Sequence, residues 1–503
     1  MTTTTVDAAI IGTGMGGGTA ALTLAPSGAT ILMLERGDFL PPEPENWSPE
    51  ANFADHRYKN AENWWDGSGE MFKPGVHYYV GGNTKVYGAA LPRFRAHDFD
   101  EIAHFDGVSP AWPLSYDEIE PYYTRAEAIY KVHATQGEDP TDPPRSGEFP
   151  FPPVPHEPVV AQLADMLRTQ GLSPFHLPLG LDLRNGGACI RCGTCDGYPC
   201  KVRAKSDAET CAVLPALEFD NVQLWPRARV DRLETNSTGT TVIGVHGSRD
   251  GQPFEVRPRH VLVACGSANS AALLLRSASP SQSQGLGNGF DQVGRYYMAH
   301  NNSVLLALRP FRRNTTTFQK TMAVNDFYCP RNSVSTYPLG NLQLIGKVHQ
   351  GTLKGARPRL SQSIRTFVVE RSIEWWVMSE DLPLANNRVS LSNDGSIVIH
   401  WTPTNMKAHR QLLSTAKRMM RRAGYPLVFS ETMGIETNSH QCGTLRMGTE
   451  ANRSVVDPMG RVHGLDNVIA VDSSVFVSSS ACNPALTIAA LSLRACEHLA
   501  ASW

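Results

Sequence analysis

The sequence has no apolar run of the roughly 18 residues that a membrane-spanning helix requires. It also has no basic region followed by an apolar stretch near its start, so we expect no export signal and a cytoplasmic location. Neither sign of charge predominates, because 46 Lys and Arg oppose 48 Asp and Glu, giving a net charge of −2. This balance argues against nucleic acid or an anionic membrane as the main partner.

Cysteine is scarce, with ten in 503 residues, and no internal repeat is visible. Half of the cysteines nevertheless lie in one short segment, namely Cys189, Cys192, Cys195, Cys200 and Cys211. In a chain without an export signal, free thiols or a metal site explain such a cluster better than a disulfide framework does.

The N-terminal region has the pattern of a βαβ unit. Val6–Ile11 is a short apolar run typical of a buried strand, Gly12–Gly18 is a glycine-rich turn, and Thr19–Ala25 has a helical pattern. A second strand is predicted at Thr30–Leu34. This order implies a parallel sheet with a crossover helix.

The pattern changes between Ser303 and Trp401 to short strands separated by turns, which predicts a second domain with a largely antiparallel sheet. The expected strands are Ser303–Leu308, Leu342–Val348, Thr366–Val369, Arg388–Leu391 and Ile397–Trp401, the last two joined by a hairpin at residues 393–395. Helices are expected at Val159–Gln170 and Ala408–Ala423. A strand at Val468–Asp472 and a helix at Pro484–Leu499 are expected to rejoin the first sheet.

The glycine turn contains Gly12, Gly14 and Gly17 in the spacing G-x-G-x-x-G, between a strand and a helix. These glycines permit a tight turn, close approach of a pyrophosphate, and packing of the helix on the sheet. Glu35 ends the second strand, where an acid can accept hydrogen bonds from a ribose diol. The motif predicts a dinucleotide site without distinguishing FAD from NAD.

Two polar residues stand out near the C-terminus. His440 lies in a segment rich in small residues, and Asn483 precedes Pro484 at the expected start of the last helix. A simple interpretation is that Asn483 caps this helix and His440 is a satisfied core histidine. The other interpretation is that both belong to a reaction site that the positive end of the helix faces. Capping would leave the amide N–H groups of Asn483 free, so for this residue the two roles are compatible.

Taken together, these segments resemble the glucose–methanol–choline (GMC) flavin oxidoreductases. The resemblance rests on Gly12–Gly17 with residues 35–37, and on the segments Val80–Gly88, Ala264–Leu275, Val471–Ser474 and Cys482–Pro484. It implies an α/β fold in which a Rossmann-like FAD-binding domain (residues 1–95, 186–300 and 430–503) carries a discontinuous α+β substrate domain (96–185 and 301–429) built on an antiparallel sheet. It also implies that the residues around FAD are Gly12, Gly14, Gly17, Glu35, Arg36, Gly82, Asn83, Thr84, Tyr87, Gly88, Val230, Gly266, Asp472, Asn483 and Pro484.

Within this family, Val80–Phe94 is similar to pyranose oxidases and to bacterial sugar (C-glycoside) 3-oxidases. Some pyranose oxidases anchor the flavin through a histidine where this chain has Val86, so we expect non-covalent FAD. The spacing of Cys189, Cys192, Cys195 and Cys200 permits a metal. Because the neighbouring residues 204–206 resemble the ordinary lid segment of the family, we expect none.

The resemblance implies the oxidation of a secondary sugar hydroxyl, at C3 or C2 of a hexose or its glycoside, with O2 reoxidising the flavin. His440 would take the hydroxyl proton, Asn483 would hold the same oxygen, and the hydride would move to flavin N5. Tryptophans could stack on the sugar, with core packing as the alternative: Trp64, Trp65, Trp375, Trp376 and Trp401. The rival interpretations are a dehydrogenase with a quinone or protein acceptor, a flavin-retaining lyase, and a non-enzymatic nucleotide-binding module.

Overall fold

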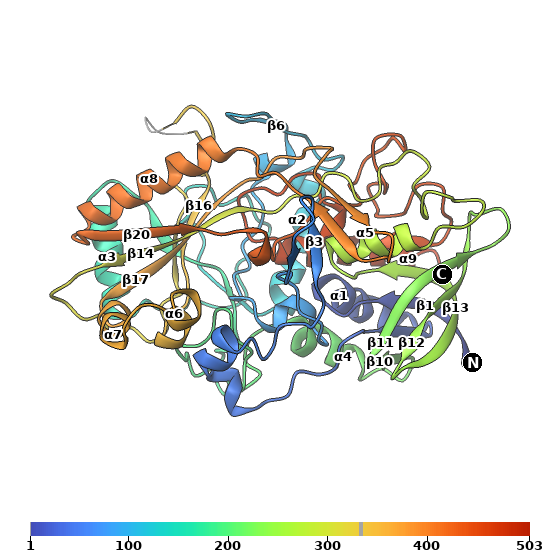
Figure 1. The fold of residues 1–503 in the computed structure, drawn as a ribbon, viewed down its shortest axis with the longest axis horizontal. Coiled ribbons are helices and arrows are strands. Elements are labelled where there is room, and N and C mark those ends of the chain that lie inside the picture. Colours follow the sequence, from blue (N-terminus) through green and yellow to red (C-terminus); the bar gives the residue numbers. More distant parts are fainter. Residues whose placement is uncertain (1, 331–334) are drawn as a thin grey trace.

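A seven-stranded sheet holds the N-terminal βαβ unit at the end of the molecule that carries both termini (Figure 1). The computed structural model describes residues 2–330 and 335–503. Five strands are parallel: β10 (Val222–Trp225), β2 (Ile31–Leu34), β1 (Thr2–Ile11), β13 (Gln252–Val263) and β21 (Val468–Ala470). β12 (Val242–Arg249) and β11 (Ala228–Thr235) extend the sheet in antiparallel fashion. The predicted parallel sheet is confirmed.

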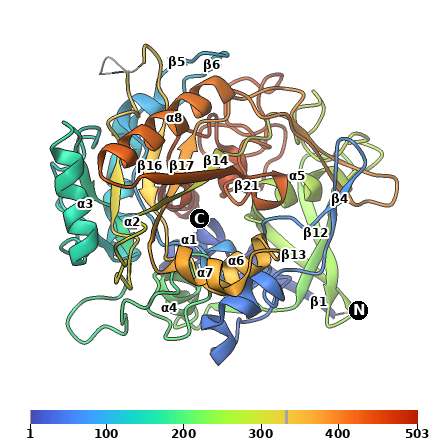
Figure 2. The same ribbon diagram turned by 60° about the vertical axis from the view of Figure 1, so that its left-hand side comes forward.

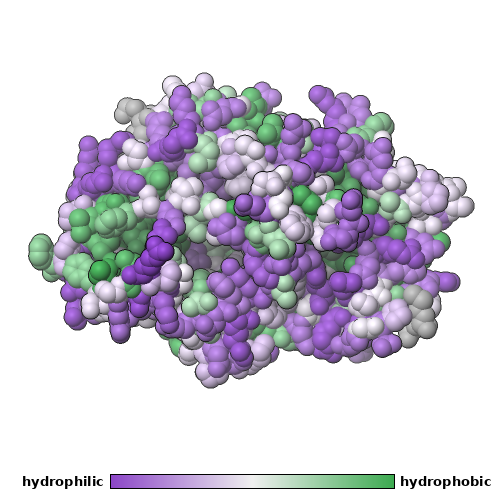
Figure 3. Space-filling view, in the orientation of Figure 1, coloured by the Kyte–Doolittle hydropathy of each residue, from purple (hydrophilic) through white to green (hydrophobic). Residues whose placement is uncertain are grey.

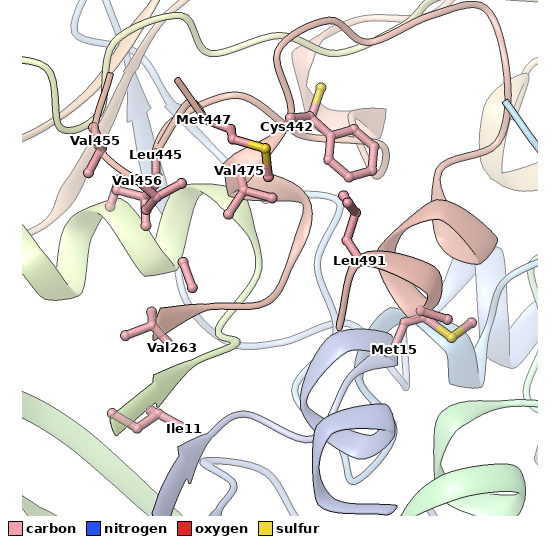
Figure 4. Close-up of a cluster of buried hydrophobic side chains, with 14 of the residues drawn as sticks. Ile11, Met15, Val263, Cys442, Leu445, Met447, Val455, Val456, Val475 and Leu491 are labelled. Atoms are coloured by element: carbon pink, nitrogen blue, oxygen red, sulfur yellow. The ribbon is translucent and has the colours of Figure 1, made fainter. Parts of the chain in front are cut away.

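The last helix returns to this sheet, as the sequence predicts. α9 (Ala485–Ala500) contacts α1 (Met15–Leu24), and the Ser492 hydroxyl donates to the Gly16 carbonyl at 2.8 Å. α5 (Ser267–Arg276) follows β13 directly. Figure 4 shows buried side chains from β1, β13, α1 and α9 converging in one cluster with the segment around residues 442–475. The C-terminal segment is therefore built into the core of the nucleotide fold.

A six-stranded sheet forms the opposite end of the molecule, as predicted for a second domain. Its strands are antiparallel and run in the order β20 (Leu427–Thr432), β14 (Asn301–Leu308), β17 (Ser372–Ser379), β16 (Asn341–Leu344), β15 (Met322–Val324) and β8 (Pro174–His176). One face packs against α3 (Pro158–Arg168) and α8 (Met406–Arg422), which Figure 2 shows beside β16 and β17. Leu342 and Trp375 point into this core. The other face points toward the interior of the molecule.

The predicted hairpin exists but belongs to another sheet. β18 (Arg388–Leu391) and β19 (Ile397–His400) pair with each other, and β19 then pairs with β3 (Trp64–Asp66), which pairs with β4 (Met71–Phe72). Val389, Ile397 and Ile399 are buried in the same core as Trp64. Burial against an N-terminal segment therefore draws these strands away from the six-stranded sheet.

The strand predicted at Thr366–Val369 is wrong, because this segment belongs to α7 (Gln362–Val369). The Ser361 hydroxyl accepts a hydrogen bond from the Ile364 N–H and so caps the helix. Ile364, Phe367 and Val368 then lie on one helical face, a spacing that the run of β-branched residues obscures.

The surface in the orientation of Figure 1 is mostly hydrophilic. The face in Figure 3 is largely polar, with an apolar patch at the left-hand end, where β20 and α7 lie and where Phe429 and Phe367 are exposed. In the described part of the chain, no helix is both long and apolar enough to cross a bilayer.

Candidate active site

The glycine turn between β1 and α1 contains positions at which no side chain fits. A Cβ on Gly12, whose φ is +100°, would lie 2.3 Å from the Ala264 carbonyl oxygen, and one on Gly17 would lie 2.0 Å from the Gly12 oxygen. A Cβ on Gly16 would lie 1.9 Å from the Val471 oxygen, so the helix packs closely on the C-terminal segment as well. These approaches hold α1 against the sheet.

Gly14 differs from its neighbours because a Cβ there would meet no heavy atom within 4 Å. It is also the N-cap of α1, with no side-chain hydrogen bond to the first turn of the helix. The turn therefore leaves open space where helix N–H groups and the positive end of the helix dipole point outward. This is the arrangement that a pyrophosphate requires.

Glu35 lies at the end of β2 and is held by the turn itself. Its Oε2 accepts the Thr13 N–H at 3.0 Å and the Thr13 hydroxyl at 2.7 Å, and its Oε1 accepts the Gly37 N–H at 2.9 Å. Burial raises the pKa of this carboxyl group. An ionised carboxylate has about four acceptor positions, so one remains for a ribose hydroxyl.

The segment Val80–Gly88 contacts the same turn. The Gly81 N–H donates to Thr13 Oγ1 at 3.2 Å, and a Cβ on Gly82 would lie 3.1 Å from the Gly14 Cα. The predicted side chains of this loop hold it in place: Asn83 Oδ1 accepts the His77 N–H, Thr84 Oγ1 accepts the Ala208 N–H, and the Tyr87 hydroxyl donates to the Ser206 carbonyl. Its backbone is therefore the part that faces the dinucleotide space.

The end of this loop lies beside a buried ion pair. A Cβ on Gly88 would lie 2.1 Å from Lys320 Nζ and 2.3 Å from Asp196 Oδ1, and these two charged groups are 2.7 Å apart. The sequence analysis did not single out Lys320. It places a cation beside the loop and, after burial and His300, contributes to lowering the pKa of His440.

Arg36 and Val230 lie at the edge of the predicted site. The Arg36 guanidinium stacks on Tyr78 at 3.7 Å and pairs with Glu62 at 3.3 Å, so it is engaged away from Glu35. Val230 lies on β11, where the pairing with β12 shifts register. The start of this strand reaches the site, since the Ala228 N–H donates to the Glu35 carbonyl at 2.8 Å.

Asp472 joins the second family segment to the C-terminal one. Its Oδ2 accepts the Gly266 N–H at 2.9 Å and the Ser270 hydroxyl at 2.6 Å, and its Oδ1 accepts the Ser474 N–H at 2.8 Å. Gly266 has a φ of +83° as the N-cap of α5. Four predicted segments thus converge on the turn, and they fit a dinucleotide such as FAD.

His440 forms a pair with a second histidine. Its Nδ1 lies 2.9 Å from Nδ1 of His300, and Nε2 of His300 lies 3.0 Å from the Ser479 carbonyl oxygen. His300 immediately precedes β14 and is buried, whereas the His440 side chain remains partly exposed. Burial, His300 and Lys320 lower the pKa of His440 well below its usual value. The His440 imidazole is therefore neutral near pH 7.

Asn483 does not cap the last helix, which corrects the simple interpretation. The helix begins at Ala485 with Pro484 as its N-cap and no side-chain cap. The Asn483 Oδ1 instead accepts a hydrogen bond from Gln343 Nε2 at 3.0 Å. This contact leaves the amide N–H groups of Asn483 as donors.

The face of the six-stranded sheet that bears Gln343 forms a roof that contacts Asn483. Gln343 on β16 is directly opposite Trp376 on β17, so both side chains lie on the same face, away from the α8 core. Trp64 and Trp375 are buried in the two cores, which rules them out as stacking surfaces for a sugar. The Trp401 Nε1 donates to Asp381 at 2.8 Å.

Sequence reasoning missed two partners of the catalytic candidates, namely His300 and Gln343, and also Ser479, which contacts His300. Gln343 falls within a predicted strand, but no local motif marks its contact with Asn483. His300 is 140 residues from His440, and no spacing in the sequence links them. Only the fold brings these residues together.

The cysteine cluster consists of free thiols. Cys189, Cys192, Cys195 and Cys200 are partly exposed and Cys211 is buried, and all are unpaired. Burial raises the pKa of Cys195 to about 12. Among residues 2–330 and 335–503, no group of three or more His, Cys, Asp or Glu is arranged to hold a metal ion.

Comparisons with known proteins agree with this geometry. Family models described as GMC oxidoreductase match residues 7–301 and 383–492. The chain is 32% identical to 6'''-hydroxyparomomycin C oxidase of Streptomyces lividus, over 98% of this chain and 92% of that protein. It is 30% identical to paromamine 6'-oxidase of Streptomyces fradiae (98% and 91%) and 27% identical to 2-methyl-1,2-propanediol dehydrogenase of Mycolicibacterium austroafricanum (98% and 95%).

Solved structures share the fold at low identity. Pyridoxine 4-oxidase from Mesorbium loti aligns with a TM-score of 0.68 at 16% identity, over 98% of this chain and 99% of that chain. Formate oxidase aligns with a TM-score of 0.67 at 15% identity, over 100% and 99%. The family models and the sequence relatives identify the chain as an FAD-dependent oxidoreductase acting on CH–OH groups. The chain belongs to the GMC oxidoreductase family.

Proposed function

We propose that this protein oxidises a hydroxyl group of a sugar or glycoside, with His440 as the base and Asn483 as the residue that holds the hydroxyl oxygen. The observation that carries this proposal is a neutral, partly exposed imidazole whose Nδ1 is already engaged by His300. Its Nε2 is then the nitrogen that can accept a proton.

The hydroxyl group needs a donor as well as a base. Because Gln343 occupies the oxygen of the Asn483 amide, the NH2 end can donate to the oxygen of a substrate alcohol. Loss of the hydroxyl proton to His440 then prepares the carbinol C–H bond for cleavage. When bound, FAD supplies the acceptor for that hydrogen and its electron pair. Because this loop has Val86 where some pyranose oxidases have a flavin-anchoring histidine, we propose that FAD is bound non-covalently.

We infer a substrate hydroxyl at C3 or C2 of a hexose or its glycoside, following the resemblance of Val80–Phe94. A second candidate is the hydroxyl at a 6 position of an aminoglycoside, because the two relatives at 30–32% identity are named as oxidases of such compounds. Both candidates agree with a polar roof that includes Gln343. In the domain division we propose, the roof belongs to the substrate domain (96–185 and 301–429).

The test is anaerobic mixing of the enzyme with monosaccharides, O-glycosides, C-glycosides and aminoglycosides, while the flavin absorbance is followed. We expect bleaching by at least one glycoside, and NMR of the product identifies the oxidised carbon. Admission of air with formation of peroxide would support O2 as the acceptor, whereas dye reduction without peroxide would indicate a dehydrogenase. If no compound bleaches the flavin, the sugar proposal fails, and a flavin-retaining lyase becomes the better explanation.

A further inference from the structure

We propose that His300 is a positioning residue that fixes the tautomer of His440 and shares the proton that His440 removes. This inference rests on the proposed function, because it assigns a partner to the base of that reaction. It starts from two contacts of the His300 ring. Nε2 of His300 contacts the Ser479 carbonyl oxygen, and Nδ1 of His300 contacts Nδ1 of His440.

The contact between His300 and Ser479 decides which nitrogen donates and which accepts in the contact between His300 and His440. A carbonyl oxygen can only accept, so the 3.0 Å contact with Ser479 requires that Nε2 of His300 carries a hydrogen. Burial lowers the pKa of His300 to about 4, so the ring is neutral near pH 7. Its Nδ1 therefore carries no hydrogen and offers a lone pair. His300 therefore presents an acceptor to its neighbour.

The second contact then fixes His440. Two ring nitrogens 2.9 Å apart share one hydrogen, and since Nδ1 of His300 has none, Nδ1 of His440 must donate. The opposite tautomer of His440 would bring two lone pairs together. Nε2 of His440 is consequently the unprotonated nitrogen, and the ring plane is held by a hydrogen bond at its far side.

The same contact stabilises the protonated state. When the alcohol O–H bond breaks and its proton moves to Nε2, His440 becomes an imidazolium whose Nδ1–H still donates to neutral His300, a charge-assisted bond. Transfer of that Nδ1 proton to His300 would leave His440 neutral and His300 cationic, with the Nε2–H of His300 still on Ser479. The charge can thus spread over both rings.

The charged groups around the pair favour this sharing. Glu380, at the end of β17, is buried and raises the pKa of His300, and it is held by the Ser109 hydroxyl at 2.6 Å and by His104 at 3.2 Å. Lys320 opposes a positive charge on His440 and is itself paired with Asp196. The negative group therefore lies on the His300 side and the positive group acts on the His440 side.

The test uses two substitutions with different consequences. His300→Leu removes both contacts. His300→Gln keeps an amide donor for Ser479 and an amide oxygen for His440, but it cannot take up a proton. The control is His409→Gln, because His409 is equally buried and its ring nitrogens contact the hydroxyls of Ser303 and Ser379.

Nitrogen NMR of the holoenzyme labelled with 15N-histidine reads the tautomer directly, with the His440 signals assigned by their loss in His440→Gln. We expect the hydrogen of His440 on Nδ1 in the wild type, His300→Gln and His409→Gln, and on Nε2 in most molecules of His300→Leu. A wild-type His440 protonated at Nε2, or an unchanged tautomer in His300→Leu, would overturn the inference. This readout does not depend on a substrate.

Stopped-flow flavin reduction supplies the second readout. We expect His300→Leu to reduce the rate roughly tenfold or more, His300→Gln to restore part of it, and His409→Gln to match the wild type. Equal rates in wild type and His300→Leu would refute the role of His300 although the sugar proposal stands. An absence of reduction by any sugar in the wild type would refute the sugar proposal, and the NMR result would still decide the tautomer.

Discussion

Gly14→Ala should separate the binding of FAD from the stability of the fold. The added methyl group meets no protein atom within 4 Å, so we expect the unfolding free energy to change by no more than about 1 kcal/mol. The methyl group would stand where the pyrophosphate approaches the helix N-terminus. If it removes one charge-assisted hydrogen bond worth about 1.5–3 kcal/mol, FAD binding weakens by a factor of roughly 10 to 150.

Gly17→Ala provides the contrast, because its methyl group would lie 2.0 Å from the Gly12 oxygen and 3.1 Å from the Ala264 Cβ. Relieving that overlap requires the turn or the helix to move, at a cost on the order of 1–3 kcal/mol or more. Gly289→Ala is the matched control, since its methyl group also meets nothing within 4 Å and lies outside the turn. Thermal melting and fluorescence titration with FAD measure the two effects. Wild-type FAD affinity in Gly14→Ala would refute our assignment of the pyrophosphate space.

Three further predictions test separate parts of the site. Gln343→Leu leaves the Asn483 oxygen without its partner, so we expect kcat to fall roughly tenfold or more while FAD content stays normal; an unchanged kcat would show that Gln343 does not position Asn483. Acid precipitation should release all the flavin into the supernatant, because Val86 cannot form a covalent link, and a yellow pellet would contradict this. Metal analysis of the purified protein should find neither iron nor zinc in stoichiometric amount, and treatment with a chelator should leave activity unchanged; stoichiometric metal at the cysteine cluster would show that our expectation of none is wrong.

The nucleotide-binding fold was accessible from the sequence because its signals are local. The glycines of the turn lie within six residues in a recognisable spacing, even though some of their steric contacts are with distant segments, and Glu35 follows at a fixed distance along the same unit. The seven-stranded sheet forms where apolar runs such as Val6–Ile11 predict it. Local geometry and global fold agree there, so pattern reasoning succeeds.

Most of the features that the sequence did not predict correctly depend on contacts between distant segments. The exception is Thr366–Val369, which has high strand propensity but continues a helix that the nearby Ser361 caps. Trp375 suggests a sugar-binding surface by its residue type, whereas the register of β17 turns it into the α8 core. Asn483 carries the local signature of a helix cap, but a glutamine 140 residues away holds its oxygen instead.

The most direct test of the central claim is the rate of anaerobic flavin reduction by a glycoside in His440→Gln, with His409→Gln as the control. The account predicts that His440→Gln binds FAD normally and reduces it roughly 10²–10⁴-fold more slowly, while His409→Gln behaves as the wild type. Reduction by His440→Gln at the wild-type rate would contradict the assignment of this imidazole as the base.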